Sequence, residues 1–215
     1  MKQVLCYGDS NTWGYATEPR PDLRYSEDER WPGIMAGALG AGFRVIEEGL
    51  PGRTTCHDDP TEGAWMNGAS YLMPCLRTHR PLDLVVIMLG TNDLKYKYNV
   101  GPYDIAEGVG ALLKIVKQAE CGRDGGVPKM LAVAPPPLHP SHGTFADFAL
   151  MFSGGDEKSK GLGGQIARVA AEYGAEFLDA GKLIVTSPYD GVHFDPPEHV
   201  KLAGAIGAKV RAMLE

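Results

Sequence analysis

The chain has 215 residues, of which 44% are hydrophobic and 22% are charged, and its formal net charge is −6. This length predicts a single domain over residues 1–215, because one hydrophobic core can keep growing to about 250 residues. The acidic balance excludes the basic surface that nucleic-acid binding requires. No apolar run reaches the roughly 18 residues of a membrane span. The four cysteines are scattered along the chain, which predicts reduced thiols in a cytoplasmic protein.

Five short apolar runs alternate with segments of helical periodicity. The runs are residues 3–7, 43–47, 82–89, 129–134 and 176–178. Apolar residues recur at helical spacing within residues 31–39, 69–78, 102–121, 165–173 and 198–214. This alternation predicts an α/β fold with a parallel sheet covered by helices. The third run is apolar on both faces, which is typical of a central strand between two helix layers.

One segment, residues 135–164, fits neither pattern. It begins with three prolines and later contains Phe145, Phe148, Met151 and Phe152, of which the three phenylalanines fit a short amphipathic helix. The sequence leaves open whether the apolar side of that helix faces the core or a ligand. Irregular stretches of more than about 15 residues usually act as lids or binding loops. We therefore expect this segment to form a lid or to contribute to a pocket or an interface.

Polar, glycine-containing segments follow the predicted strands. Residues 8–14 follow the first strand, residues 49–55 the second and residues 90–93 the third, and residues 190–193 come after the fifth. Because ligands bind at the carboxyl ends of strands in such sheets, we expect these segments to converge there. A serine, an asparagine, backbone donors and an Asp/His pair in one crevice indicate acyl transfer.

The chemistry assigns a role to each of these side chains. Ser10 is the candidate nucleophile, because a serine hydroxyl becomes reactive when an adjacent base takes its proton. His193 is the candidate base, and Asp190, three residues earlier, can hold the imidazole in the required tautomer. The amides of Ser10 and Gly52 and the side chain of Asn92 are candidate donors to the oxyanion.

These residues belong to motifs that resemble a known family. Gly8-Asp9-Ser10, Gly52, Gly90-Thr91-Asn92-Asp93 and Asp190-x-x-His193 resemble, in this order, the SGNH hydrolases, also called the GDSL esterase/lipase superfamily. Residues 47–50, 53–55, 67–72 and 81–93 are similar to its bacterial arylesterase and perhydrolase branch. The resemblance implies a three-layer α/β/α flavodoxin-like sandwich with a central five-stranded parallel sheet. It also implies the catalytic residues Ser10, Asp190 and His193, an oxyanion hole of Ser10, Gly52 and Asn92, and no metal or organic cofactor.

Members of that branch hydrolyse short acyl esters of aryl and alkyl alcohols, and some transfer the acyl group to alcohols or peroxide. The resemblance therefore implies a cytoplasmic serine esterase with a small-molecule ester substrate. It further implies acyl transfer or perhydrolysis as an additional activity, and a homo-oligomer without nucleic-acid or membrane partners. The alternatives are a carbohydrate O-acetylesterase or thioesterase with the same triad and, more remotely, a flavodoxin-like phosphate- or nucleotide-binding protein.

Four further residues are candidates for the substrate pocket. Asn11 directly follows the nucleophile, where the family has leucine. Trp13 follows the nucleophile by three residues, and we expect its ring to form an aromatic wall of the pocket together with Phe152 and Phe194.

Overall fold

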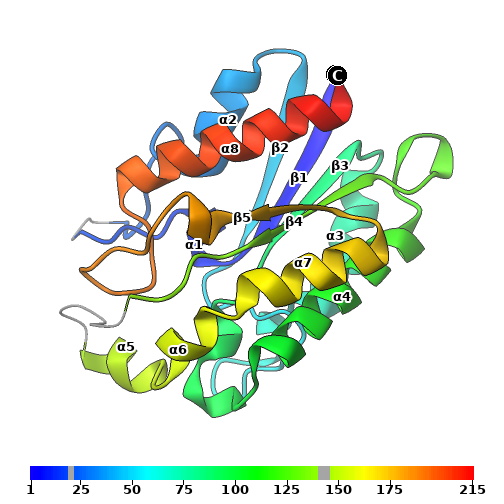
Figure 1. The fold of residues 1–215 in the computed structure, drawn as a ribbon. Coiled ribbons are helices and arrows are strands. Elements are labelled where there is room, and N and C mark those ends of the chain that lie inside the picture. Colours follow the sequence, from blue (N-terminus) through cyan, green and yellow to red (C-terminus); the bar gives the residue numbers. More distant parts are fainter. Residues whose placement is uncertain (19–21, 140–145) are drawn as a thin grey trace.

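The structure is a computed structural model that describes residues 1–18, 22–139 and 146–215. Five parallel strands form one sheet in the order β2-β1-β3-β4-β5. The strands are β1 (Lys2–Gly8), β2 (Phe43–Gly49), β3 (Leu84–Met88), β4 (Lys129–Ala134) and β5 (Glu176–Asp179). Helices cover both faces of the sheet (Figure 1), so the predicted three-layer α/β/α fold is confirmed.

The helices divide between the two faces of the sheet. On one face lie α2 (Trp31–Leu39) and α8 (Pro196–Leu214), which pack against each other (Figure 1). The other face carries α3 (Gly68–His79), α4 (Pro102–Ala119) and α7 (Leu162–Tyr173).

The remaining helices are short. They comprise α1 (Ser10–Trp13), α5 (Ala146–Met151) and α6 (Gly155–Ser159), and the 3-10 helices η1 (Ala64–Met66), η2 (Asn92–Leu94), η3 (Tyr96–Tyr98), η4 (Arg123–Gly125) and η5 (Ala180–Lys182).

The side chains of β3 alternate between two hydrophobic cores. Leu84, Val86 and Met88 belong to the core beneath α2 and α8, whereas Val85 and Ile87 belong to the core beneath α3, α4 and α7. Each of the five is no more than 1% exposed. Successive side chains of a strand point to opposite faces, so a strand buried on both faces must be apolar throughout. The run 82–89 therefore predicted a central position for this strand correctly.

The register brings the ends of the neighbouring strands β2, β1 and β3 level with one another. Gly8 at the end of β1 pairs with Gly49 of β2 and with Met88 of β3. The segments that follow these strands thus leave the sheet at the same edge. The loop from β5 to α8 reaches this edge too, where the amide of His139, after β4, donates to the carbonyl of Gly191 (2.9 Å).

The segment 135–164 is helical in much of its described part. It contains α5 and α6, so the predicted short helix is present from residue 146 onward. Phe148 and Met151 lie on α5, and Phe152 follows directly. Phe145 lies outside the described residues.

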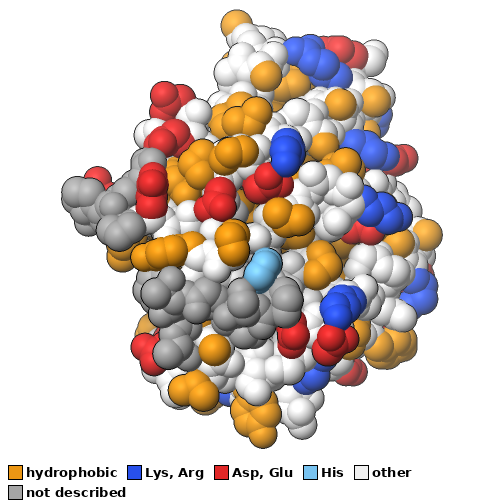
Figure 2. Space-filling view, turned by 60° about the vertical axis from the view of Figure 1, so that its left-hand side comes forward, with side chains coloured by type: hydrophobic (Ala, Val, Ile, Leu, Met, Phe, Trp, Pro, Cys, Tyr) orange, Lys and Arg blue, Asp and Glu red, His pale blue; other side chains and the backbone are white. Residues whose placement is uncertain are grey.

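The thiols and one face of the surface can be compared with the expectations from composition. The four cysteines are free, and Cys6, Cys75 and Cys121 are buried while Cys56 is partly exposed. Acidic and basic side chains are interspersed with hydrophobic ones on the face shown in Figure 2. No helix in the described part of the chain combines the length and the apolar character needed to cross a membrane.

Candidate active site

Ser10 opens a one-turn helix directly after β1. The buried carboxylate of Asp9 caps this helix by accepting a hydrogen bond from the amide of Asn11 (2.9 Å), and burial raises the pKa of Asp9 to about 6. The helix ends at Gly14, whose φ of +90° favours glycine. The amide of Tyr15 then donates back to the carbonyl of Ser10 (2.9 Å). This tight turn holds the Ser10 hydroxyl at the end of the strand.

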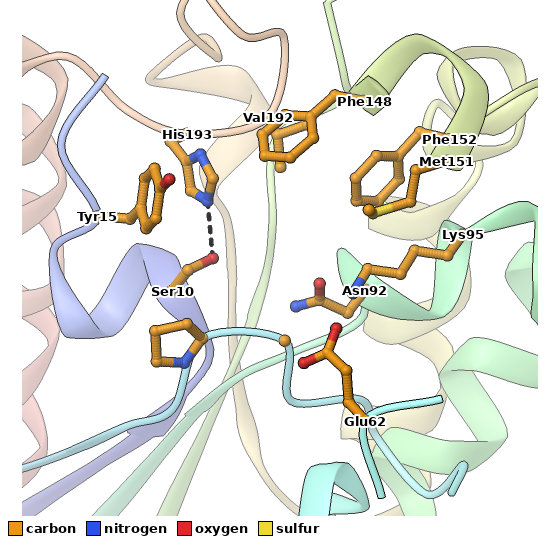
Figure 3. Close-up of a pocket in the computed structure, with 12 residues that line it drawn as sticks. Ser10, Tyr15, Glu62, Asn92, Lys95, Phe148, Met151, Phe152, Val192 and His193 are labelled. Carbon is orange, nitrogen blue, oxygen red and sulfur yellow. Dashed lines mark hydrogen bonds between the residues drawn. The ribbon is translucent and has the colours of Figure 1, made fainter. Parts of the chain in front are cut away.

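The structure brings Ser10, His193 and Asp190 into one hydrogen-bonded line. The Oγ atom of Ser10 lies 2.9 Å from Nε2 of His193 (Figure 3), and Nδ1 of the same imidazole lies 2.6 Å from Oδ2 of Asp190. The other oxygen of Asp190 accepts the amides of Val192 (2.8 Å) and His193 (2.9 Å). Burial alone would raise the pKa of Asp190, but these bonds hold it below its usual range. Asp190 therefore stays ionised and holds the proton of His193 on Nδ1.

Three nitrogen donors lie next to the nucleophile. Gly52, in the loop after β2, has a φ of +88°. Residues with a side chain rarely adopt this backbone conformation, so glycine is favoured at this position. The side-chain amide of Asn92 donates one hydrogen to the carbonyl of Arg53 (3.1 Å), which leaves the second hydrogen available. Within the described chain, neither the amide of Ser10 nor that of Gly52 donates a hydrogen bond to another residue. Unengaged donors of this kind are what an oxyanion hole requires.

A buried carboxylate links the two loops that carry Gly52 and Asn92. Asp93, which is fully buried, accepts the backbone amide of Thr55 (3.0 Å) and its hydroxyl (2.5 Å). It also bonds Nδ1 of His57 (3.0 Å), which raises the pKa of that imidazole. These bonds fix the loop after β2 against the segment after β3.

A cavity of about 180 Å³ opens above the triad. Its apolar side is formed by Tyr15, Phe148, Met151, Phe152 and Val192 (Figure 3). The ring of Tyr15 stacks on the imidazole of His193, with ring centres 4.3 Å apart and an angle of 21° between the planes. The cavity is small for a ligand pocket, which favours small substrates.

Of the four residues expected in the pocket, the structure places only Phe152 in its lining. The partly exposed ring of Trp13 does not line the described cavity and lies beneath the guanidinium of Arg24 (4.8 Å), whereas Tyr15, after the turn at Gly14, stacks on His193. This corrects the expectation for the aromatic wall.

The other two residues are buried. Asn11, 2% exposed, donates through its side chain to the carbonyl of Val192 (3.3 Å) and thus ties α1 to the loop that carries His193. Phe194 is fully buried in the core beneath α2 and α8, where its ring lies edge-on to His199. Neither Asn11 nor Phe194 lines the described cavity, so both expectations are corrected.

Sequence reasoning missed several residues of the lining. Tyr15 had a detectable signal, since Gly14 predicts the end of a helix and a reversal of the chain toward Ser10. Phe148 was recognised on the apolar side of a short helix but was not assigned to the pocket, and Met151 was noted only as part of the same segment. Glu62 and Lys95 had no recognisable signal, because each stands in an irregular segment.

The comparisons with known proteins agree with this geometry. The model of the GDSL-like lipase/acylhydrolase family matches residues 6–201. The chain belongs to this family. Among solved structures, the GDSL hydrolase described here is similar to the native aryl esterase of M. smegmatis, with 44% identity, a TM-score of 0.93 and full coverage of both chains. It is also similar to a carbohydrate acetylesterase from Sinorhizobium meliloti, with 46% identity, a TM-score of 0.92 and full coverage of both chains. A search of curated proteins finds no significant match.

Away from the triad, the described part of the GDSL hydrolase contains one group of side chains with the composition of a metal site. The ligand atoms of Glu48, Cys75 and His79 all lie within 4.8 Å of one another. Nε2 of His79 already bonds Glu48 (2.9 Å), and burial raises the pKa of Cys75 to about 12. A thiol that keeps its proton is a poor metal ligand, so this group is best described as a hydrogen-bonded structural cluster.

Proposed function

We propose that this GDSL hydrolase is a serine esterase that hydrolyses short-chain acyl esters of aryl and alkyl alcohols through an acyl-enzyme. The observation that carries the proposal is the hydrogen-bonded line from Asp190 through His193 to Ser10, with distances of 2.6 and 2.9 Å. Next to this triad, the backbone amides of Ser10 and Gly52 and the side chain of Asn92 offer N–H groups that can bind an oxyanion. The similarity to an aryl esterase and to a carbohydrate acetylesterase supports the same conclusion.

The reaction follows from this arrangement. His193 takes the proton of Ser10 as the Oγ atom attacks the ester carbonyl, and the carbonyl oxygen becomes an oxyanion held by the three nitrogen donors. His193 then gives the proton to the departing alcohol, which leaves the acyl group on Ser10. Water, deprotonated by His193, attacks this acyl-enzyme and releases the carboxylic acid. Asp190 stabilises the imidazolium in both steps.

The size and the lining of the cavity favour a short acyl group. They also favour transfer of this group from Ser10 to acceptors other than water. Its volume of about 180 Å³ and its apolar side leave little room for water around the acyl group. An alcohol or a peroxide that packs against Phe148 and Phe152 competes with water as the acceptor. We therefore include acyl transfer to such acceptors in the proposal.

The phosphate-binding alternative is less compatible with the site. A phosphate would bind at the start of α1, but the carboxylate of Asp9 already accepts the amide of Asn11 there. A thioesterase would use the same triad and differ in its leaving group.

The proposal is tested with 4-nitrophenyl acetate and a fluorophosphonate label read by intact mass. The wild type is expected to turn over the ester and to gain a single adduct. Ser10→Ala is expected to gain no adduct and to lower kcat by at least about 10⁴-fold. Ser70→Ala, which changes an exposed serine of α3, serves as the matched control. No turnover and no adduct from folded wild-type protein would refute the proposal.

A further inference from the structure

Two charged side chains line the catalytic cavity without taking part in the triad. Lys95 lies between η2 and η3, three residues after Asn92, and Glu62 belongs to the loop that precedes η1. Both point into the cavity (Figure 3). The Oε2 atom of Glu62 lies 3.6 Å from the position that a Cβ atom on Gly52 would occupy. The two charges therefore stand beside the candidate oxyanion hole.

The ammonium group of Lys95 reaches the cavity and is unpaired among the described residues. Lys95 is only 5% exposed, yet in the described chain its ammonium has no hydrogen-bond or ion-pair partner. Lys97, two residues later, differs in this respect, because its ammonium bonds the carboxylate of Asp59. An ammonium that lines a cavity and bonds no side chain keeps its donors for another partner. A substrate group that enters the cavity can be that partner.

The carboxylate of Glu62 is also available. In the described chain its side chain has no hydrogen bond, and it does not approach Lys95 to within the 4.0 Å of an ion pair. Burial lowers the pKa of Lys95, whereas the negative charge of Glu62 raises it, so the two charges interact electrostatically across the cavity. The cavity thus offers a donor and an acceptor that do not satisfy each other.

A buried aspartate holds the two charged segments in place. Asp59 is 2% exposed and accepts the amides of Thr61 (2.9 Å) and Glu62 (3.0 Å). It also accepts the hydroxyl of Tyr98 (2.9 Å) and the ammonium of Lys97, on the segment that carries Lys95. Glu62 and Lys95 are therefore anchored by one network.

We propose that Glu62 and Lys95 determine specificity by binding a hydroxyl group on the alcohol portion of the ester. This inference rests on the proposed esterase function. An ammonium only donates and a carboxylate only accepts, whereas a hydroxyl does both and can bridge the two. The charges cancel, so the pair favours neither an anion nor a cation. The short acyl group carries no hydroxyl, so the hydroxyl belongs to the alcohol, whose apolar face packs against Phe148 and Phe152.

The test compares two acetate esters of matched shape. One is a methyl glucoside acetylated on its 6-hydroxyl, and the other is cyclohexylmethyl acetate, which has the same ring size but no hydroxyls. Release of acetate gives kcat/KM for each ester, and 4-nitrophenyl acetate serves as the reference. The variants are Lys95→Met and Glu62→Gln, which remove one charge each at nearly constant shape. Lys114→Met, at an exposed position of α4, removes the same charge as Lys95→Met outside the cavity.

We expect the wild type to favour the hydroxylated ester by about ten-fold or more in kcat/KM, because a hydrogen bond to a charged group contributes more than one to a neutral group. Lys95→Met and Glu62→Gln should each reduce this preference about ten-fold, and Lys114→Met should leave it unchanged. The effect should appear mainly in the ratio between the two esters, which a general loss of structure would not change.

Three results would overturn the inference. The first is equal kcat/KM for the two esters in the wild type, and the second is a preference that survives both variants. The third is a preference of the wild type for 4-acetoxybenzoate over phenyl acetate. If Glu62→Gln increased this preference and Lys95→Met removed it, the cavity would bind an anionic substrate group instead of a hydroxyl. Turnover of 4-nitrophenyl acetate separates these results from a failure of the esterase function, in which no ester is hydrolysed and Ser10 takes no label.

Discussion

The replacement Asp190→Asn provides a sharp test of the triad, because the structure determines how the new amide must lie. The Oδ1 atom of Asp190 accepts two backbone amides, those of Val192 (2.8 Å) and His193 (2.9 Å). An asparagine keeps these bonds only if its oxygen takes the same place. Its NH₂ group then faces Nδ1 of His193, where Oδ2 of the aspartate stood at 2.6 Å.

Two donors cannot face each other, so His193 must move its proton from Nδ1 to Nε2. The Oγ atom of Ser10, 2.9 Å from Nε2, then meets an N–H group instead of a lone pair. His193 can then no longer act as a general base, although the side chains of the triad keep their positions. In triads of this type the wrong tautomer lowers kcat by about 10⁴-fold, which corresponds to about 5 kcal/mol of transition-state stabilisation.

The assay is the steady-state hydrolysis of 4-nitrophenyl acetate at pH 7.5 by the wild type and the variant, with circular dichroism as the test of folding. The loss should appear in kcat, with a much smaller change in KM. A folded Asp190→Asn protein that keeps kcat within ten-fold of the wild type would refute the assignment of His193 as the base oriented by Asp190.

Two other predictions follow from single contacts. Asn92→Ala should lower kcat for 4-nitrophenyl acetate by about 10²-fold, with a smaller effect on KM. A change in KM alone would contradict the assignment of Asn92 to the oxyanion hole. Burial lowers the pKa of His199 to about 3, and its Nδ1 accepts the amide of Trp31 (3.2 Å). The unfolded chain binds this proton near pH 6.5, so the stability that His199 contributes is complete above that pH. It is lost as the pH falls toward 3, by up to about 1.4 kcal/mol per pH unit. Urea unfolding from pH 7 to 4 should therefore show a weaker pH dependence in His199→Gln than in the wild type, and equal slopes would contradict this account.

The sequence predicted the sheet well because each strand carries its own signal. The run 82–89 is apolar on both faces, which is possible only for a strand covered on both sides, and β3 is such a strand. Helix ends were predicted less accurately, since α7 begins at Leu162 and α8 at Pro196, a few residues before the expected positions. Leu162 extends α7 because it packs into the core, and α8 starts earlier because proline fits the first turn of a helix.

The candidate triad was predictable because each of its members follows a strand. Ser10 stands directly after β1, and Asp190 and His193 are three residues apart in one loop, so the topology of a parallel sheet brings them together. The pocket was not predictable in the same way. Trp13 and Tyr15 are two residues apart, and only the left-handed turn at Gly14 determines which ring lies over His193.

The sequence by itself thus determined the strands, their common edge and the residue types that converge there, because apolar periodicity and position after a strand are local properties. Only the tertiary structure decided that Phe194 is buried in the core, and that Tyr15 stacks on His193. It alone placed Glu62 and Lys95 in one cavity, from loops brought together by Asp59. The direction of a side chain in an irregular segment depends on contacts with residues far away in the chain, and no local pattern records those contacts.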